Sequence, residues 1–451
     1  MADALNPSAV EGPSGPSTTP ESKPTGVISR PGLLERMFVV AVLLLTSGAL
    51  VPMLRLPDPE GSPWAASTGN GLQQAIWLGV YLTALITVLP RWRTLLAAMA
   101  VNKWIPALMA LALASTFWST TPALTFRRAA AVDLAGLFGY YLAIHFTRRQ
   151  VLELLAIALG TALLLSFIFV VFLPSYGVYF DQYRGLTWRG VFLHKQPLGR
   201  AASLGVLVFL LQEGGGRRRW IRFGGAALGL LLVIESGSST AIIATVAMGA
   251  VALMLLTLDR KRPLALPTLL TATCALLLTV AAAHLNPVQG VLGILGKEGT
   301  LTGRTGLWSH VIAAIGHRPY LGYGWSNFWR GWGGPGSATV WHQVDWHPVH
   351  SHSGYLDLLL DVGVVGFAVF LMGALKLVRQ AIVRYRAVGH RRMDLWPLLF
   401  LTFWLMEATT ENVLVQNSIF WVLFVFTAAS VGMAERRGGA EIVPQARADV
   451  T

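Results

Sequence analysis

The amino-acid sequence predicts an all-α polytopic membrane protein. Of its 451 residues, 54% are hydrophobic and only 13% are charged, a balance that excludes an ordinary soluble domain. Apolar runs close to the ~20 residues that a helix needs to cross a bilayer recur along the whole chain. One long polar interruption, residues 285–352, separates two of these runs. Together these observations predict about 12 transmembrane helices and one long outward loop.

The apolar runs define the expected spans in order. Residues 221–256 are long enough for two spans, and the polar turn Ser236–Ser239 divides them. The segments 104–118 and 199–212 are short for a span. The expected spans are Met37–Leu54, Leu72–Leu89, Trp104–Trp118, Arg128–Phe146, Val151–Leu173, Gly199–Gln212, Ile221–Ile234, Thr240–Leu256, Leu264–His284, Gly354–Val378, Leu395–Glu411 and Asn417–Ala434.

This order divides the chain into five parts. The first is rich in Pro, Ser, Thr and Gly, a composition typical of disorder. The parts are a disordered cytoplasmic tail (1–36), an N-terminal transmembrane bundle of about nine spans with an outer loop at 174–198 (37–284), the large outer loop (285–352), C-terminal transmembrane helices (353–434) and a cytoplasmic tail (435–451).

The net charge of +13 reflects membrane topology rather than nucleic-acid binding. Lys and Arg concentrate in alternate loops, as in 217–222, 260–262 and 376–392. This is the positive-inside pattern, which places both termini in the cytoplasm when the number of spans is even. Anionic membrane lipids are therefore the expected partners of the positive charge, and nucleic acid is not. The single Cys274 allows neither a disulfide nor a cysteine metal site within the chain.

Two arginines in the outward loops depart from this charge pattern. Arg189 lies in the polar segment 188–199 that leads into a span, and Arg304 precedes the helical pattern of 307–315. A solvated surface charge is the ordinary explanation for a loop arginine. However, backbone N–H groups at a helix start, together with a guanidinium fork, also suit a phosphate. The sequence leaves both interpretations open.

Histidines gather at the end of the large loop. His347, His350 and His352 lie there, with His342 nearby. They could serve as a zinc site, as structural hydrogen-bonding groups or as a general base near neutral pH, although their i, i+2 spacing suits a metal site on a helix poorly. Asp357 could orient one of them or cap the following helix.

Carboxylates within the spans are a further signal, because an ionisable group in a bilayer is costly. Glu407 and Glu411 share one face of the eleventh span, Asp133 lies in the fourth and Glu235 ends the seventh. They could fix the outer arginines or act as ion relays in a transporter.

Four motifs follow one another between about residues 188 and 425. They are Trp188–Lys195; Gly303–Thr305 with Trp308, continued by Arg318–Gly324; His350–Asp357 with Gly363 and Gly366; and Thr410–Leu414 with Asn417 and Trp421. In this order they resemble the motifs of the O-antigen ligase superfamily, and most closely those of its exopolysaccharide-polymerase (ExoQ-like) branch. Gln196 and Ser353 stand where the family usually has Asn, and we expect altered geometry there rather than lost activity.

The resemblance implies a GT-C-like glycosyltransferase of the bacterial inner membrane that works on the periplasmic side without metal or cofactor. It implies three catalytic residues: Arg189 and Arg304 would neutralise the diphosphate leaving group, and His352 would act on the attacking hydroxyl. The implied partners are an undecaprenyl-diphosphate-linked oligosaccharide, membrane lipids and other polysaccharide export components. The substrate-binding residues implied are Arg184, Lys195, His350, Glu411 and Tyr355.

Three functions compete for this sequence. The favoured one is a polymerase that joins lipid-linked repeat units during exopolysaccharide biosynthesis. A ligase that transfers the finished glycan to lipid A-core or to protein would use the same donor chemistry. A multi-span transporter or flippase is the alternative from another class, supported by the many spans and their carboxylates. The concentration of polar residues in one outer loop favours an enzyme.

Overall fold

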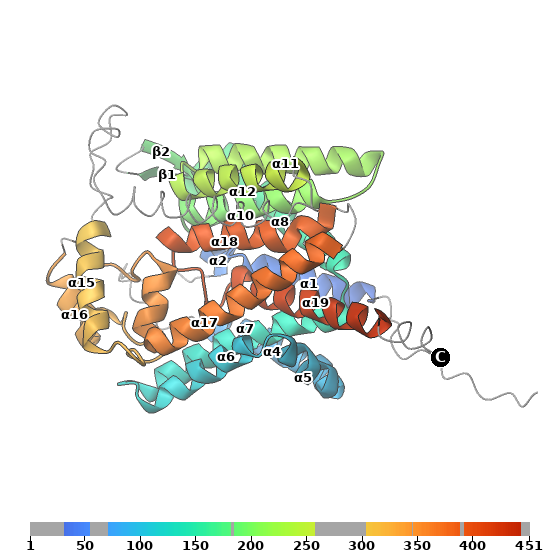
Figure 1. Ribbon diagram of the computed structural model, residues 1–451. Helices are drawn as coiled ribbons and strands as arrows, with labels where there is room; N and C mark the ends of the chain where they lie inside the picture. The colour runs from blue at the N-terminus through green and yellow to red at the C-terminus, as the bar shows by residue number, and fades with distance from the viewer. Residues whose placement is uncertain are drawn as a thin grey trace, which may run out of the picture.

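The structure is a computed structural model that describes residues 31–54, 71–181, 185–257, 304–344, 346–387 and 392–442. The expected span Leu264–His284, Arg184 and residues 285–303 lie outside these ranges. The described chain is mostly helical (Figure 1). Its helices are α1 (Leu33–Thr46), α2 (Val51–Leu54), α4 (Gly71–Val88), α5 (Trp92–Val101), α6 (Trp104–Ala114), α7 (Pro122–His145), α8 (Arg148–Phe172), α9 (Pro174–Gly177), α10 (Lys195–Leu211), α11 (Arg217–Glu235), α12 (Ser239–Thr257), α15 (Arg304–His317), α16 (Pro335–Trp341), α17 (Gly354–Ala387), α18 (Trp396–Thr410) and α19 (Ile419–Ile442).

The helical class expected from the sequence is confirmed, and each expected span within the described ranges falls on one or more helices. The predicted break between two spans also occurs, because α11 ends at Glu235 and α12 begins at Ser239 around Gly237, whose φ is 61°. Among the described residues, five helical stretches are long and apolar enough to cross a membrane: Gln74–Val101, Arg148–Phe172, Ser239–Leu256, Gly354–Ala387 and Ile419–Arg436. The number of 12 spans remains a prediction.

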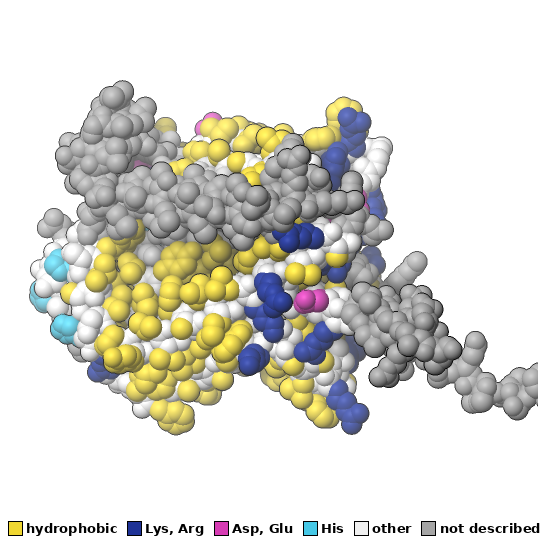
Figure 2. Space-filling model, in the orientation of Figure 1, with side chains coloured by type: hydrophobic (Ala, Val, Ile, Leu, Met, Phe, Trp, Pro, Cys, Tyr) yellow, Lys and Arg dark blue, Asp and Glu magenta, His cyan; other side chains and the backbone are white. Residues whose placement is uncertain are grey.

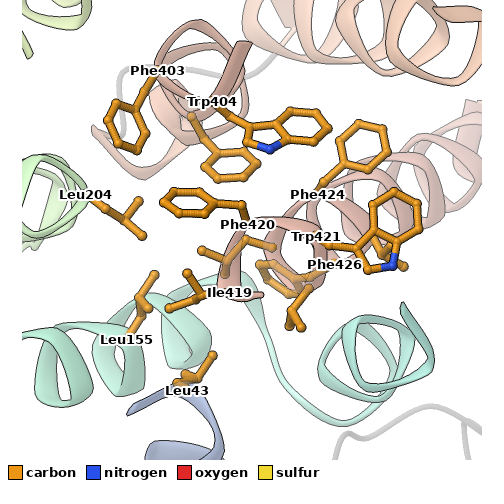
Figure 3. Close-up of a cluster of buried hydrophobic side chains, with 14 of the residues drawn as sticks. Leu43, Leu155, Leu204, Phe403, Trp404, Ile419, Phe420, Trp421, Phe424 and Phe426 are labelled. Carbon is orange, nitrogen blue, oxygen red and sulfur yellow. The ribbon is translucent and has the colours of Figure 1, made fainter. Parts of the chain in front are cut away.

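Buried aromatic rings of α18 and α19 form much of the bundle core (Figure 3). The rings of Trp404 and Phe424 lie 4.5 Å apart between centroids. The indole N–H of Trp404 donates to the carbonyl of Val413 (2.9 Å), and that of Trp421 donates to the carbonyl of Val132 on α7 (3.1 Å). These bonds matter because a buried indole N–H without a partner would be costly. The rings therefore fill the core and also fix the α18–α19 loop and α7.

The helices α7 and α19 approach each other closely at Gly139. A Cβ atom placed on Gly139 would lie 2.6 Å from the carbonyl oxygen of Val422 and 2.8 Å from Cβ of Val425. Small residues allow this kind of backbone contact between helices in membranes, where close packing replaces the hydrophobic effect as the source of association.

Residues 304–353, here called the cap, fold against the ends of α6, α7 and α17. The cap has a small hydrophobic core of its own, formed by Leu307, Trp308, Val311, Phe328 and Val340 together with Leu360 of α17. Hydrogen bonds from Trp118 Nε1 to the carbonyl of Leu321 (3.0 Å) and from the backbone N–H of Trp325 to Ser115 Oγ (2.8 Å) attach it to the α6–α7 corner. The described part of the large loop is thus an ordered unit.

The helix α17 is broken at Gly363, which has a φ of 63° and a ψ of −166°. A break in a helix leaves backbone N–H and C=O groups without their usual partners. Here the cap segment 319–324 supplies them through four backbone hydrogen bonds. These run from Tyr323 N to Leu360 O (2.7 Å), from Gly324 N to Asp361 O (3.0 Å), from Val364 N to Pro319 O (2.8 Å) and from Val365 N to Tyr320 O (3.2 Å). The motif Arg318–Gly324 is therefore the part of the cap that completes α17.

We predict that Gly363→Ala destabilises the protein. The residue needs a left-handed backbone, and its new Cβ would lie 2.3 Å from the carbonyl carbon and oxygen of Tyr320. The backbone conformation alone should cost about 1–3 kcal/mol, to which the overlap adds. Thermal unfolding in detergent measures the effect. Gly249→Ala on α12 is the control, because its Cβ would meet nothing within 4 Å. Equal melting temperatures for the two variants would contradict the role of the break.

Candidate active site

Two histidines from the end of the cap and one carboxylate from the α18–α19 loop meet in space. His350, His352 and Glu411 each offer one side-chain atom that could ligate a metal, and these three atoms lie within 4.8 Å of one another. The two imidazole rings are 4.1 Å apart between centroids. Both histidines are half-buried, whereas Glu411 is buried. We call these three residues the histidine–glutamate cluster.

The turn that carries the histidines is held by Asp357 in the first turn of α17. Its Oδ1 accepts hydrogen bonds from the backbone N–H of Ser351 (3.0 Å) and from Nε1 of Trp329 (2.8 Å). Ser353 Oγ accepts from the backbone N–H of Leu356 (3.5 Å), so it acts as an N-cap for α17. Asp357 thus orients the histidines through the backbone. Because Asn and Ser are both good N-cap residues, Ser353 can fill a position where the related motif has Asn.

The backbone at His352 is strained. His352 has a φ of 55°, in the left-handed region that residues other than glycine rarely adopt. Its N–H donates to Nδ1 of His350 (3.1 Å), so a neutral His350 carries its proton on Nε2. Such strain costs about 1–3 kcal/mol and clusters at functional sites, where the surrounding structure holds it in place. The ring of Trp346 packs against His352 at 5.4 Å.

Arg200 of α10 completes the site. Its Nη1 lies 3.2 Å from Oε2 of Glu411, and the two side chains are only 15% and 9% exposed. From the sequence we expect Glu411 to fix an arginine, but Arg200 does not stand out there as the partner. The available signal was its position as the sixth residue of α10, immediately before the uncharged stretch 201–211 of the same helix.

The α18–α19 loop is attached directly to the histidine turn. The backbone N–H of Gly354 donates to the carbonyl of Glu411 (3.1 Å). A Cβ on Gly354 would lie 2.9 Å from Cγ of Leu414, so only a glycine allows this approach. The motifs His350–Asp357 and Thr410–Leu414 therefore form one structural unit.

The outer loop before α10 forms a short hairpin of β1 (Val178–Asp181) and β2 (Gly185–Trp188). Lys195 Nζ pairs with Asp181 Oδ2 (2.5 Å), and Nε of Arg189 donates to the carbonyl of Tyr176 (2.7 Å). Both predicted residues thus support the hairpin. Within the described ranges, no hydrogen bond or ion pair joins Arg189 or Lys195 to the histidine–glutamate cluster.

The remaining predicted site residues have different positions. Arg304 is the first residue of α15, and its side chain lies outside the described part of the structure, as does all of Arg184. Tyr355 donates its hydroxyl to the carbonyl of Leu405 on α18 (2.8 Å), which commits that hydroxyl to helix packing.

The histidines of the large loop do not form one group. His347 packs against Trp341 and Trp332 at 4.6 and 5.5 Å, and His342 packs against Trp332 at 4.9 Å. Among the described residues, the group that could hold a metal is instead the histidine–glutamate cluster, which offers two imidazoles and a carboxylate, the ligands that zinc accepts. The guanidinium of Arg200 next to the carboxylate disfavours a divalent cation there.

Comparison with known proteins identifies a family for part of the chain. Residues 224–371, which include both histidines of the cluster, match the O-antigen ligase family. We therefore identify the chain as a multi-pass membrane protein that carries an O-antigen ligase domain.

Two relatives extend the comparison. The chain is 28% identical over 309 residues to the exopolysaccharide production protein ExoQ of Rhizobium meliloti (strain 1021), which covers 65% of this chain and 68% of that protein. It is 22% identical over 164 residues to a putative polysaccharide ligase of Rickettsia conorii, covering 33% of this chain and 40% of the relative. The resemblance inferred from the sequence motifs is confirmed.

We predict that the side chains of Arg200 and Glu411 stabilise the fold only when both are present. Arg200→Met or Glu411→Gln alone removes one side of this largely buried ion pair, at a cost of about 1–3 kcal/mol each. The double variant should lose less than the sum of the two, as measured by thermal unfolding. The exposed pair Arg149–Glu153 on α8 is the control, and its removal should cost at most about 0.5 kcal/mol. Strict additivity at Arg200 and Glu411 would show that the two side chains are not coupled.

Proposed function

We propose that this protein is an inner-membrane glycosyltransferase that polymerises undecaprenyl-diphosphate-linked oligosaccharide repeat units on the periplasmic face. The observation that carries the proposal is the cluster of His350, His352 and Glu411, with Arg200, where the cap meets the helix bundle. The O-antigen ligase match supports the class of reaction. The match to the relative named for exopolysaccharide production covers more of both chains than the match to the putative polysaccharide ligase, which favours a polymerase over a ligase.

The proposed reaction is the displacement of a diphosphate by a sugar hydroxyl. The hydroxyl oxygen forms a bond with the anomeric carbon of the donor, and the bond from that carbon to the diphosphate oxygen breaks. His352 accepts the hydroxyl proton, and the nearby carboxylate of Glu411 stabilises the imidazolium that results. Arg189 and Arg304 are assigned to the leaving diphosphate, whose growing negative charge suits guanidinium groups.

The proposed orientation puts the cap and the hairpin in the periplasm and both termini in the cytoplasm. In Figure 2 the histidines lie at the cap end, whereas most Lys and Arg side chains in view lie toward the end where α19 finishes. The positive-inside tendency makes that basic end cytoplasmic.

We predict that single cysteines report this orientation once Cys274 is replaced by serine. Gln343→Cys in the cap should react with an impermeant maleimide in spheroplasts, because the cap faces outward. Arg386→Cys, near the end of α17, should react only after permeabilisation. Both native side chains are exposed, so accessibility itself does not distinguish them. The reverse pattern would remove the proposed site from the periplasm.

A deletion strain tests the function directly. Loss of a polymerase should leave single lipid-linked repeat units, whereas loss of a ligase should leave long lipid-linked chains. Loss of a flippase should leave single units on the cytoplasmic leaflet, where externally added glycosidases cannot reach them. Accumulation of single units accessible from the periplasm is the expected result, and either of the other outcomes would contradict the proposal.

We predict that Arg304→Lys impairs polymer synthesis far more than Arg318→Lys. A bidentate phosphate fork at position 304 would become a point charge, and losing a donor aimed at developing charge costs about 10²–10³ in rate. Arg318 instead lies over the ring of Tyr323, with its guanidinium carbon 5.1 Å from the ring centroid. The measurement is polymer formed per unit of protein in membranes. Near-normal synthesis by both variants would exclude Arg304 as a ligand of the leaving group.

We predict that His352→Ala lowers turnover at least about 10²-fold while donor binding survives, because the residue acts on the acceptor hydroxyl. His347→Ala is the matched control, since that ring packs against Trp341 outside the cluster. The purified enzyme should also retain its activity in EDTA. Activity that is lost in EDTA and restored by zinc or magnesium would instead assign the histidine–glutamate cluster to a metal.

A further inference from the structure

A cavity of about 300 Å³ lies beside the proposed catalytic site. Its walls come from the end of α1, the segment that leads into α10 and the α18–α19 loop, so segments distant in sequence enclose it. One part of the wall is apolar and includes Leu45, Leu159, Leu204, Ile419 and Phe420. Figure 3 shows Leu155, Leu204, Ile419 and Phe420 lying close together in this region of the bundle.

The other part of the wall is unusually polar for a membrane protein interior. It includes Ser47, Arg200, Asn412, Asn417 and Ser418. Within the described residues, Oγ of Ser418 is buried without a hydrogen-bond partner. A buried hydroxyl in this state costs about 1–3 kcal/mol, which a polar ligand can recover.

A second polar group of the wall is held in a fixed orientation. Oδ1 of Asn417 accepts a hydrogen bond from the hydroxyl of Tyr81 (2.5 Å), and the ring of Tyr81 stacks on Trp77, itself a wall residue. This bond does not use the two N–H groups of the Asn417 amide. The cavity therefore combines planar amide and guanidinium groups, a hydroxyl and aromatic rings.

Arg200 connects the cavity to the catalytic site. The same side chain lines the cavity and lies 3.2 Å from Glu411, whose carboxylate is within 4.8 Å of the histidine nitrogens. Asn412, the next residue after Glu411, also lines the cavity. A group bound there would adjoin the residues assigned to proton transfer.

The size and chemistry of the cavity limit what it can bind. At about 30 Å³ per water molecule, it has room for roughly ten waters, close to one sugar ring and far less than an oligosaccharide or a complete polyprenyl chain. Six polar residues line the cavity, Thr46 among them, and they suit hydroxyl groups better than an isoprenoid, which would offer them no hydrogen bonds.

We propose that this cavity is a subsite for the terminal sugar of the acceptor, held next to His352 by Arg200, Asn417 and Ser418. The inference rests on the proposed glycosyltransferase function and adds the place where the attacking sugar binds. The hydroxyl of Ser418 and the Asn417 amide bind sugar hydroxyl groups, and the apolar wall contacts the faces of the ring.

Cysteine protection tests the subsite in the full-length protein with Cys274 replaced by serine. Ser418→Cys is treated with a small methanethiosulfonate reagent, with and without the repeat-unit oligosaccharide released from the host's own lipid-linked pool. The labelling rate should fall at least tenfold at saturating oligosaccharide. Ser309→Cys, exposed on α15 and outside the cavity, should be labelled at the same rate in both cases.

Each other outcome overturns the subsite. Protection by undecaprenyl phosphate in vesicles, but not by the oligosaccharide, would assign the cavity to the lipid. Unchanged labelling, or no labelling of the Ser418→Cys variant under any condition, would show that sugar does not enter it. Polymerisation by the wild-type protein is measured in parallel. If the wild type polymerises while protection fails, only the subsite is wrong; if the wild type forms no polymer, the proposed function itself fails.

Discussion

The satisfaction of backbone hydrogen bonds at the break in α17 is the constraint on which the rest of the site depends. Within a membrane no water is available to pair with free N–H and C=O groups, so an interrupted helix must find protein partners. Residues 319–324 of the cap provide them around Gly363. The backbone groups of the cap and of α17 at this break are therefore hydrogen-bonded only when the two are packed together.

A few contacts connect this junction to the histidine–glutamate cluster. The first half of α17 carries Asp357, whose carboxylate fixes Ser351 and so the turn between the histidines. Gly354, the first residue of α17 after this turn, donates its backbone N–H to the carbonyl of Glu411. The carboxylate of Glu411 in turn pairs with Arg200. Geometry at His352 thus depends on groups from the cap, α17, the α18–α19 loop and α10, which explains how the strained backbone of His352 persists.

The sequence was informative about what local pattern and composition determine. Apolar run lengths predicted the helices, and the order of motifs predicted a relationship that the comparisons confirm. Single residues were harder to predict, because their partners are set by packing. Arg200 and Glu411 are 211 positions apart, and no periodicity reveals such a pair. His347 was grouped with the other histidines because it is close in sequence, but Trp341 holds it elsewhere.

The hydrogen bonds at the α17 break involve only main-chain atoms, which has a consequence for how this surface can evolve. Tyr320 takes part through its backbone carbonyl, while its side chain is 75% exposed. The chemical identity of the Tyr320 side chain is therefore independent of the geometry of the histidine–glutamate cluster. Proteins in membranes that differ in head groups or surface hydration can exchange this side chain without disturbing the cluster, whereas Gly322 and Gly363 allow no such exchange.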